Sequence, residues 1–68
     1  MPERLANKIK ERRGELGLTQ SELAEQVGVT RKTVNTVENG VFTPSATLAI
    51  KLSQALGVSV EQLFWIER

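Results

Sequence analysis

The 68-residue sequence predicts an all-α fold, a compact five-helix domain that spans residues 1–68. Glycines follow four of the apolar helical patterns, where they are typical C-terminal stops. A hydroxyl residue stands three positions before Glu or Gln at two expected helix starts, which is the spacing of a capping box. No segment of strand length alternates cleanly between apolar and polar residues, so no strand is expected.

The first helix is expected over residues 3–16. Leu5, Ile9 and Leu16 fall on one helical stripe, and Arg13 lies on the same stripe four residues after Ile9. This helix is therefore expected to bury three apolar side chains and to bring one positive charge inward with them.

The second and third helices are separated by only three residues, Gly-Val-Thr at 28–30. Thr19 is the expected N-cap of the second helix, with Glu22 completing a capping box, and Thr30 repeats the N-cap for the third. So short a connection favours a sharp turn over antiparallel side-by-side packing. The pattern predicts a helix-turn-helix, although tight turns between short helices also occur in other bundles.

The fourth helix is expected to have Thr43 as its cap and Pro44 at its first position, and to run to Leu56. The fifth is expected to open at Ser59, with Gln62 at its third position forming the second capping box. From this last segment the core is expected to take Val60, Leu63 and Phe64.

Two opposite charges are expected to face inward, Arg13 from the first helix and Glu38 from the third. A buried charge without a partner is costly, so the two side chains are expected to pair and to fix the third helix against the first. In the alternative, both long side chains reach solvent at the edge of the core.

The composition argues against several classes of function. The chain has no Cys and no His, which excludes disulfides and the usual zinc or iron ligand sets. It has no Tyr and no nucleotide-binding glycine loop, so neither an enzyme nor a cofactor is expected. No apolar run approaches the length that spans a membrane, and a cysteine-free chain without a signal peptide favours the cytoplasm.

The net charge is only +1, but it is unevenly distributed. Five basic residues stand between positions 4 and 13 against a single acidic residue, and the third helix opens with Arg31 and Lys32. A balanced total with a basic patch favours a specific anion-binding face over indiscriminate coating of nucleic acid. An ordinary solvated helix face is the alternative on charge alone.

Two segments, LTQSELAEQVGVTRKTVNTVENG at 18–40 and PSATLAIKLSQALGVSVEQLF at 44–64, resemble the lambda-repressor/Cro-like, or Xre-type, helix-turn-helix regulators. The resemblance covers roughly residues 5–65, and its motifs are specific because they occur together. It implies a lambda-repressor-like DNA-binding fold. It further implies a sequence-specific regulator of transcription, a repressor or autoregulator, whose third helix enters the major groove of double-stranded DNA.

The resemblance also implies which residues contact DNA. Gln20 is similar to a glutamine that contacts a phosphate and braces the recognition helix, and the Arg13–Glu38 pair is similar to a structural pair of the family. The full set of implied DNA contacts is Gln20, Thr30, Arg31, Lys32, Thr33, Asn35, Thr36, Asn39 and Gly40. Several phage repressors have glutamines where this chain has Arg31, Lys32 and Thr36, so their operator preferences do not transfer.

Family relatives of this bare-domain type bind pseudo-palindromic operators as homodimers, and residues 58–68 are the expected dimerisation element. An exposed Trp beside isoleucines is typical of a contact patch. The expected interface consists of Ile50, Phe64, Trp65 and Ile66. A C-terminal lid on the same subunit is one alternative. Another is an antitoxin or other interaction module, whose fourth and fifth helices bind a protein partner.

Overall fold

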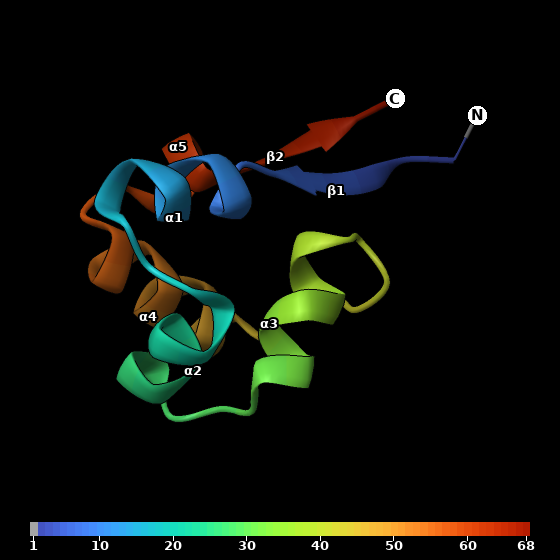
Figure 1. Cartoon of the computed structure of the whole chain (residues 1–68). Coiled ribbons are helices and arrows are strands. Elements are labelled where there is room, and N and C mark those ends of the chain that lie inside the picture. The colour runs from blue at the N-terminus through green and yellow to red at the C-terminus, as the bar shows by residue number, and fades with distance from the viewer. Residues whose placement is uncertain (1) are drawn as a thin grey trace.

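The computed structural model describes residues 2–68, and within them the chain forms five helices and two short strands. In chain order these are β1 (Arg4–Asn7), α1 (Ile9–Leu16), α2 (Gln20–Val27), α3 (Arg31–Glu38), α4 (Ala46–Leu56), α5 (Val60–Leu63) and β2 (Phe64–Glu67). Figure 1 shows the helices gathered in one bundle and the paired strands extending from its side. The predicted five-helix fold is confirmed, with a small two-stranded ribbon added to it.

The two strands correct the predictions that the chain has no strand and that its first helix covers residues 3–16. β1 pairs antiparallel with β2, with Arg4 opposite Glu67 and Asn7 opposite Phe64. Helix α1 begins only at Ile9, whose backbone N–H donates to the Asn7 side chain at 3.1 Å. Each strand is stabilised by a partner at the opposite end of the chain, and local periodicity does not show such pairing.

The core lies between the five helices. Its most deeply buried side chains come from every helix: Ile9, Leu23, Val34, Leu52, Leu56 and Leu63. Burial of apolar surface is the main favourable term in folding, and a domain of this size has little of it to spare. The position of α3 is therefore fixed by a small number of apolar contacts.

Two apolar side chains that were expected inside the core are exposed at its margin. Leu16 is the last residue of α1, and Val60 is the first residue of α5. Because both stand at helix ends, the apolar stripe has already passed the edge of the core at these positions.

Most of the predicted helix starts are confirmed. Besides the α1 start, the α4 start also differs, because Ser45 rather than Thr43 is its N-cap. The Ser45 hydroxyl accepts from the Leu48 N–H at 3.1 Å, so the helix begins after Pro44. No helix within residues 2–68 is long and apolar enough to cross a membrane. The confirmed N-caps, each accepting from the third helical N–H, are Thr19, Thr30 and Ser59.

Candidate functional site

Helix α3 buries one face in the core and exposes its outer side. Val34 and Val37 are buried and anchor the helix in the core. Successive helical residues turn by about 100°, so the side chains that do not share the face of the valines lie on the flanks and on the outer side. These are the predicted DNA contacts of the helix, of which three are exposed and the two threonines are half-buried: Arg31, Lys32, Thr33, Asn35 and Thr36.

The turn before α3 is set by residues 28–30. Gly28 has a φ of 75°, the left-handed conformation in which the chain leaves α2. The Val29 N–H then donates to the Ala24 carbonyl oxygen at 3.0 Å, and the small Ala24 side chain is buried. Helix α3 therefore starts one residue later, at its Thr30 cap, and the predicted helix-turn-helix is present.

An ion pair joins α1 to α3 through the two charges predicted to face inward. Arg13 Nε donates to Glu38 Oε2 at 2.8 Å, and Arg13 Nη2 donates to Glu38 Oε1 at 3.2 Å. The Glu38 side chain is 4% exposed and the Arg13 side chain 14%, so the two do not reach solvent as the alternative required. The hydrogen bond to Glu38 raises the pKa of Arg13 above its ordinary value, which keeps the guanidinium charged.

The same carboxylate is linked to the exposed surface through Gln20. Gln20 Nε2 donates to Glu38 Oε1 at 3.2 Å, and Gln20 Oε1 accepts from Arg31 Nη1 at 3.2 Å. Because the amide nitrogen is used on the carboxylate, the amide oxygen is the atom that can accept from Arg31. A chain of hydrogen bonds therefore runs from α1 through Glu38 and α2 to the first residue of α3, and it holds the Arg31 guanidinium in place.

The hydroxyl groups of the helix are mostly used within the chain itself. The Thr36 hydroxyl donates to the Thr33 carbonyl oxygen at 3.0 Å. The Thr33 and Thr30 hydroxyl oxygens lie 3.1 Å apart, within hydrogen-bonding distance. Within residues 2–68, by contrast, the Lys32 and Asn35 side chains have no hydrogen-bond partner. These two side chains are therefore available to an external ligand.

The C-terminal end of α3 is held by Asn7, a supporting residue that the sequence analysis missed. Asn7 Nδ2 donates to the Val37 carbonyl oxygen at 3.1 Å. At the same end, Asn39 Nδ2 donates to the Asn35 carbonyl oxygen at 2.8 Å, and Gly40 has a φ of 72°. Asn39 and Gly40 are both exposed, as DNA contacts must be. An Asn just before a helical pattern could have identified Asn7 as the acceptor of the Ile9 N–H, but not its contact with the end of α3.

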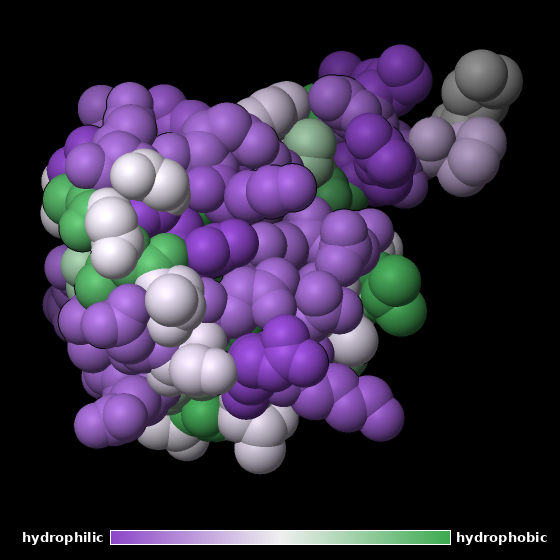
Figure 2. Space-filling view, viewed as in Figure 1, coloured by the Kyte–Doolittle hydropathy of each residue, from purple (hydrophilic) through white to green (hydrophobic). Residues whose placement is uncertain are grey.

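Two exposed apolar residues follow α3 and were also missed. Val41 is 79% exposed and Phe42 is 50% exposed. Their backbone N–H groups both donate to the Thr36 carbonyl oxygen, at 2.9 and 3.2 Å, so the loop turns back onto α3. Figure 2 shows hydrophobic atoms at the edge of the molecule where Figure 1 draws this loop. The apolar pair directly after Glu-Asn-Gly was the signal in the sequence.

The basic cluster of residues 4–13 does not form the free anion-binding face that its spacing suggested. Three of its five cations pair with carboxylates of the same chain: Arg4 with Glu67, Arg12 with Glu15, and Arg13 with Glu38. The Arg12 side chain also donates to the Leu56 carbonyl oxygen at the end of α4, at 2.8 Å. Within residues 2–68, Lys8 and Lys10 are the members of this cluster without a carboxylate partner.

The residues predicted for a dimer contact differ in exposure. Ile50 on α4 and both Trp65 and Ile66 on β2 are about half exposed. Phe64 is only 7% exposed and belongs to the core, so it is removed from the predicted contact. Successive strand residues point to opposite faces, so Trp65 and Ile66 lie on different faces of the ribbon rather than in one flat patch.

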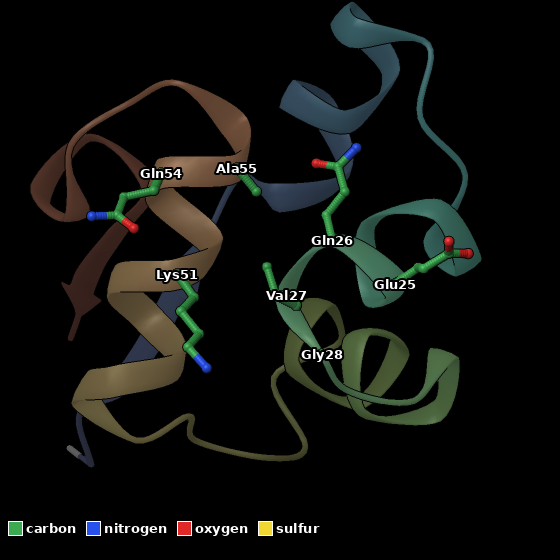
Figure 3. A pocket seen from close by; sticks show the side chains of 7 residues that line it. All are labelled: Glu25, Gln26, Val27, Gly28, Lys51, Gln54 and Ala55. Carbon is green, nitrogen blue, oxygen red and sulfur yellow. The ribbon is translucent and has the colours of Figure 1, made fainter.

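A wide hollow lies between the C-terminal end of α2 and helix α4 (Figure 3). Figure 3 shows that its two charged side chains, Glu25 and Lys51, do not point toward one another. The hollow therefore lacks the converging polar groups typical of a small-molecule site. No three His, Cys, Asp or Glu side chains within residues 2–68 are placed to hold a metal ion.

Comparison with known sequences identifies related proteins over nearly the whole chain. A helix-turn-helix family model matches residues 9–63. The uncharacterized HTH-type transcriptional regulator YgzD from Bacillus subtilis is 44% identical over 63 residues, which cover 93% of this chain and 96% of that protein. Antitoxin HipB from Escherichia coli O6:H1 is 39% identical over 59 residues, which cover 87% of this chain and 63% of that protein.

Solved structures share the arrangement of the helices. The restriction-modification controller protein C.AhdI from Aeromonas hydrophila has a TM-score of 0.77 at 36% identity, and the match covers 82% of this chain and 85% of that one. The P22 c2 repressor, solved in complex with a synthetic operator, has a TM-score of 0.75 at 30% identity. This match covers 78% of this chain and 80% of the repressor chain.

Proposed function

This chain belongs to the helix-turn-helix family of lambda-repressor-like, or Xre-type, transcriptional regulators, and from that membership we propose that it binds specific DNA sequences. In this proposal α3 enters the major groove, whose width of about 12 Å admits one helix. The protein acts as a repressor or an autoregulator of transcription. Residues 1–68 form one DNA-binding domain, and no catalytic activity is proposed.

The observation that carries this proposal is the hydrogen-bonded chain from Arg13 to Arg31. A guanidinium that is held in place before DNA arrives loses less conformational freedom on binding than a free one does. Arginine can donate two hydrogen bonds to guanine O6 and N7, which only the G·C pair offers in that pattern. A preorganised Arg31 at the start of α3 is therefore suited to read a base.

The resemblance assigns Gln20 a phosphate contact as well as a bracing role. Both of its amide heavy atoms already hold partners, Glu38 and Arg31, and this supports the bracing role. Lys32 and Asn35 supply free donors beside Arg31 on the same helix. Phosphate binding is then shared by Lys32, by Asn39 with the Gly40 backbone, and by the N-terminal N–H groups of α2.

We further propose that the protein binds DNA as a homodimer, with residues 58–68 and Ile50 at the subunit contact. One helix of this length covers too little DNA to discriminate a site in a genome, whereas two recognition helices double the number of base contacts. The exposed Ile50, Trp65 and Ile66 support the proposal, because half-exposed large apolar side chains favour association. Two-fold symmetry requires a pseudo-palindromic operator with half-sites about 34–36 Å apart.

Selection of bound sites from random double-stranded DNA, at a fixed salt concentration, tests the proposed function. We expect a two-fold-symmetric motif whose half-sites are one helical turn apart, and an affinity that falls steeply as salt rises. Recovery of unselected sequence after repeated rounds would show that the chain is not a sequence-specific DNA-binding protein.

A second candidate function is that of an antitoxin, which neutralises a partner protein. The likeness to antitoxin HipB and the exposed apolar residues of α4 and β2 favour it. Purification of the tagged chain from its native cells distinguishes the two candidates. Recovery of a second polypeptide at a fixed stoichiometry would support the antitoxin, and recovery of the chain alone would support the homodimeric regulator.

A further inference from the structure

We propose that Val41 and Phe42, together with the methyl groups of Thr33 and Thr36, form an apolar surface that contacts the C5 methyl groups of thymine in the major groove. This inference rests on the proposed function, because it requires α3 to lie in that groove. To the proposed function it adds recognition of thymine, which the charged and amide side chains of α3 do not provide.

The four residues lie around one shallow hollow beside α3. Its volume is about 320 Å³, and its lining is Lys32, Thr33, Thr36, Val41 and Phe42. Three of these residues belong to the flank and outer side of the recognition helix, and two belong to the loop that follows it. The apolar surface is therefore continuous with the proposed DNA-binding face.

The loop holds its two side chains at a defined place. The Val41 and Phe42 N–H groups both donate to the Thr36 carbonyl oxygen, at 2.9 and 3.2 Å. Gly40 has a φ of 72°, which turns the chain back toward α3 at that point. The backbone that carries these two exposed apolar side chains is thus held against the helix.

The threonine hydroxyl groups at this surface already have partners within the chain. The Thr36 hydroxyl hydrogen is donated to the Thr33 carbonyl oxygen, and the Thr33 hydroxyl lies at hydrogen-bonding distance from that of Thr30. What the threonines can still offer a ligand is largely their methyl groups. Phe42 and Val41 have no polar side-chain atoms at all, so the surface is suited to an apolar contact.

Thymine is the base that presents an apolar group in the major groove, its C5 methyl. A side chain that instead packed on deoxyribose would contact every sequence equally, because each nucleotide has the same sugar. Lys32, which also lines the hollow, can hold a neighbouring phosphate while the apolar side chains face the bases. The apolar surface therefore favours thymine at particular positions of the operator.

Replacement of thymine by deoxyuracil in the selected operator tests this inference, because it removes only the methyl group. We expect the wild-type protein to lose affinity by about fourfold for each contacted methyl, from the burial of one carbon. Phe42→Ala should bind the thymine operator more weakly, yet lose little more when thymine is replaced. Val41→Thr, which conserves volume at the most exposed position, should show a smaller loss of the same kind.

Leu16→Ala is the matched control, because Leu16 is an exposed apolar residue at the end of α1, outside this surface. It should keep the sensitivity of the wild type to deoxyuracil. Equal affinity of the wild type for both operators would overturn the inference, and so would equal sensitivity in Phe42→Ala. Both outcomes leave sequence-specific binding intact, whereas failure to select any motif would remove the proposed function itself.

Discussion

Glu38 is the residue on which the placement of α3 most depends. Its carboxylate accepts from two Arg13 nitrogens and from Gln20, and these donors come from α1 and α2. One side chain thus connects three helices. Gln20 in turn accepts a hydrogen bond from Arg31, at the proposed DNA-binding face. Charge-assisted hydrogen bonds of this kind are stronger than neutral ones and fix geometry as well as energy.

Replacement of Glu38 by Ala should therefore destabilise the fold strongly. The substitution leaves the Arg13 guanidinium largely buried without a counter-charge, which costs about 3–5 kcal/mol. Urea unfolding, followed by circular dichroism, measures the change in the free energy of unfolding. Glu25→Ala, at an exposed glutamate of α2, is the control and should change that free energy by less than about 0.5 kcal/mol. Equal urea midpoints for Glu38→Ala and the wild type would contradict this role.

A second residue-scale prediction concerns pH and Glu22. Its carboxylate accepts from the Thr19 N–H at 2.9 Å, and the hydrogen bonds with Thr19 lower its pKa below the ordinary value of 4.5. Because the folded pKa is the lower one, this stabilisation is present above pH 4.5 and is lost as the pH falls through the folded pKa. At neutral pH the wild type should have a higher melting temperature than Glu22→Gln. Below the folded pKa, where Glu22 is protonated in both states, that difference should vanish. A difference in melting temperature that stays constant with pH would contradict the prediction.

The sequence allows part of this residue-scale arrangement to be predicted. Arg13 and Glu38 could be paired because each lies on an apolar stripe, where a charge needs a partner. The bond between Gln20 and Arg31 could not, since it depends on the distance between two exposed long side chains from different helices. Val41 and Phe42 were overlooked for a similar reason, because exposure of an apolar residue in a loop depends on tertiary structure.

At the scale of elements, helix ends were more predictable than strands. The capping residues act through hydrogen bonds within three positions, so Thr19, Thr30 and Ser59 could be identified locally. Strands β1 and β2 are four residues each and pair across the whole length of the chain. The spacing of Leu5 and Ile9 also fits a helix, which is why the first helix was extended too far.

Two glycines give an element-scale prediction with opposite signs. Gly14 lies inside α1, and an added Cβ would have no atom within 4 Å outside the local helix. Gly14→Ala should therefore stabilise the fold by about 0.5–1 kcal/mol. Gly28 also has open space around a Cβ but has a φ of 75°, so Gly28→Ala should destabilise the fold by roughly 1–2 kcal/mol.

Thermal unfolding of the two variants side by side measures these changes. Since neither added methyl meets a neighbouring atom, the difference between them isolates backbone conformation. A lower melting temperature for Gly14→Ala than for the wild type, or an unchanged one for Gly28→Ala, would show that the two helix descriptions are wrong.

At the scale of the whole molecule, the bundle and the ribbon have different roles. The bundle fixes α3 through its core, and the ribbon carries Trp65 and Ile66 on its two faces. The fold class could be predicted because the helices, their stops and the helix-turn-helix spacing are local features. The division of Trp65 and Ile66 between two faces could not, because it follows from a strand that the sequence did not reveal.

The proposed homodimer leads to a prediction about mass in solution. Analytical ultracentrifugation of the wild type should give a mass that rises from monomer to dimer with concentration, and Trp65→Ala should shift that equilibrium toward monomer. Leu16→Ala removes an exposed apolar side chain elsewhere and should leave the equilibrium unchanged. A monomer mass at every concentration, unaffected by Trp65→Ala, would contradict dimerisation through the ribbon.

The central claim is that α3, positioned through Glu38 and Gln20, reads bases with Arg31. Competition binding of the selected operator against each of its single-base variants tests this claim most directly, with wild type, Arg31→Ala and Lys8→Ala compared. Arg31→Ala should lose about 1–3 kcal/mol of discrimination at one or two base positions in each half-site and keep the rest. Lys8→Ala should preserve the whole pattern of preference. Equal weakening by Arg31→Ala at every position, with all preferences retained, would contradict the claim.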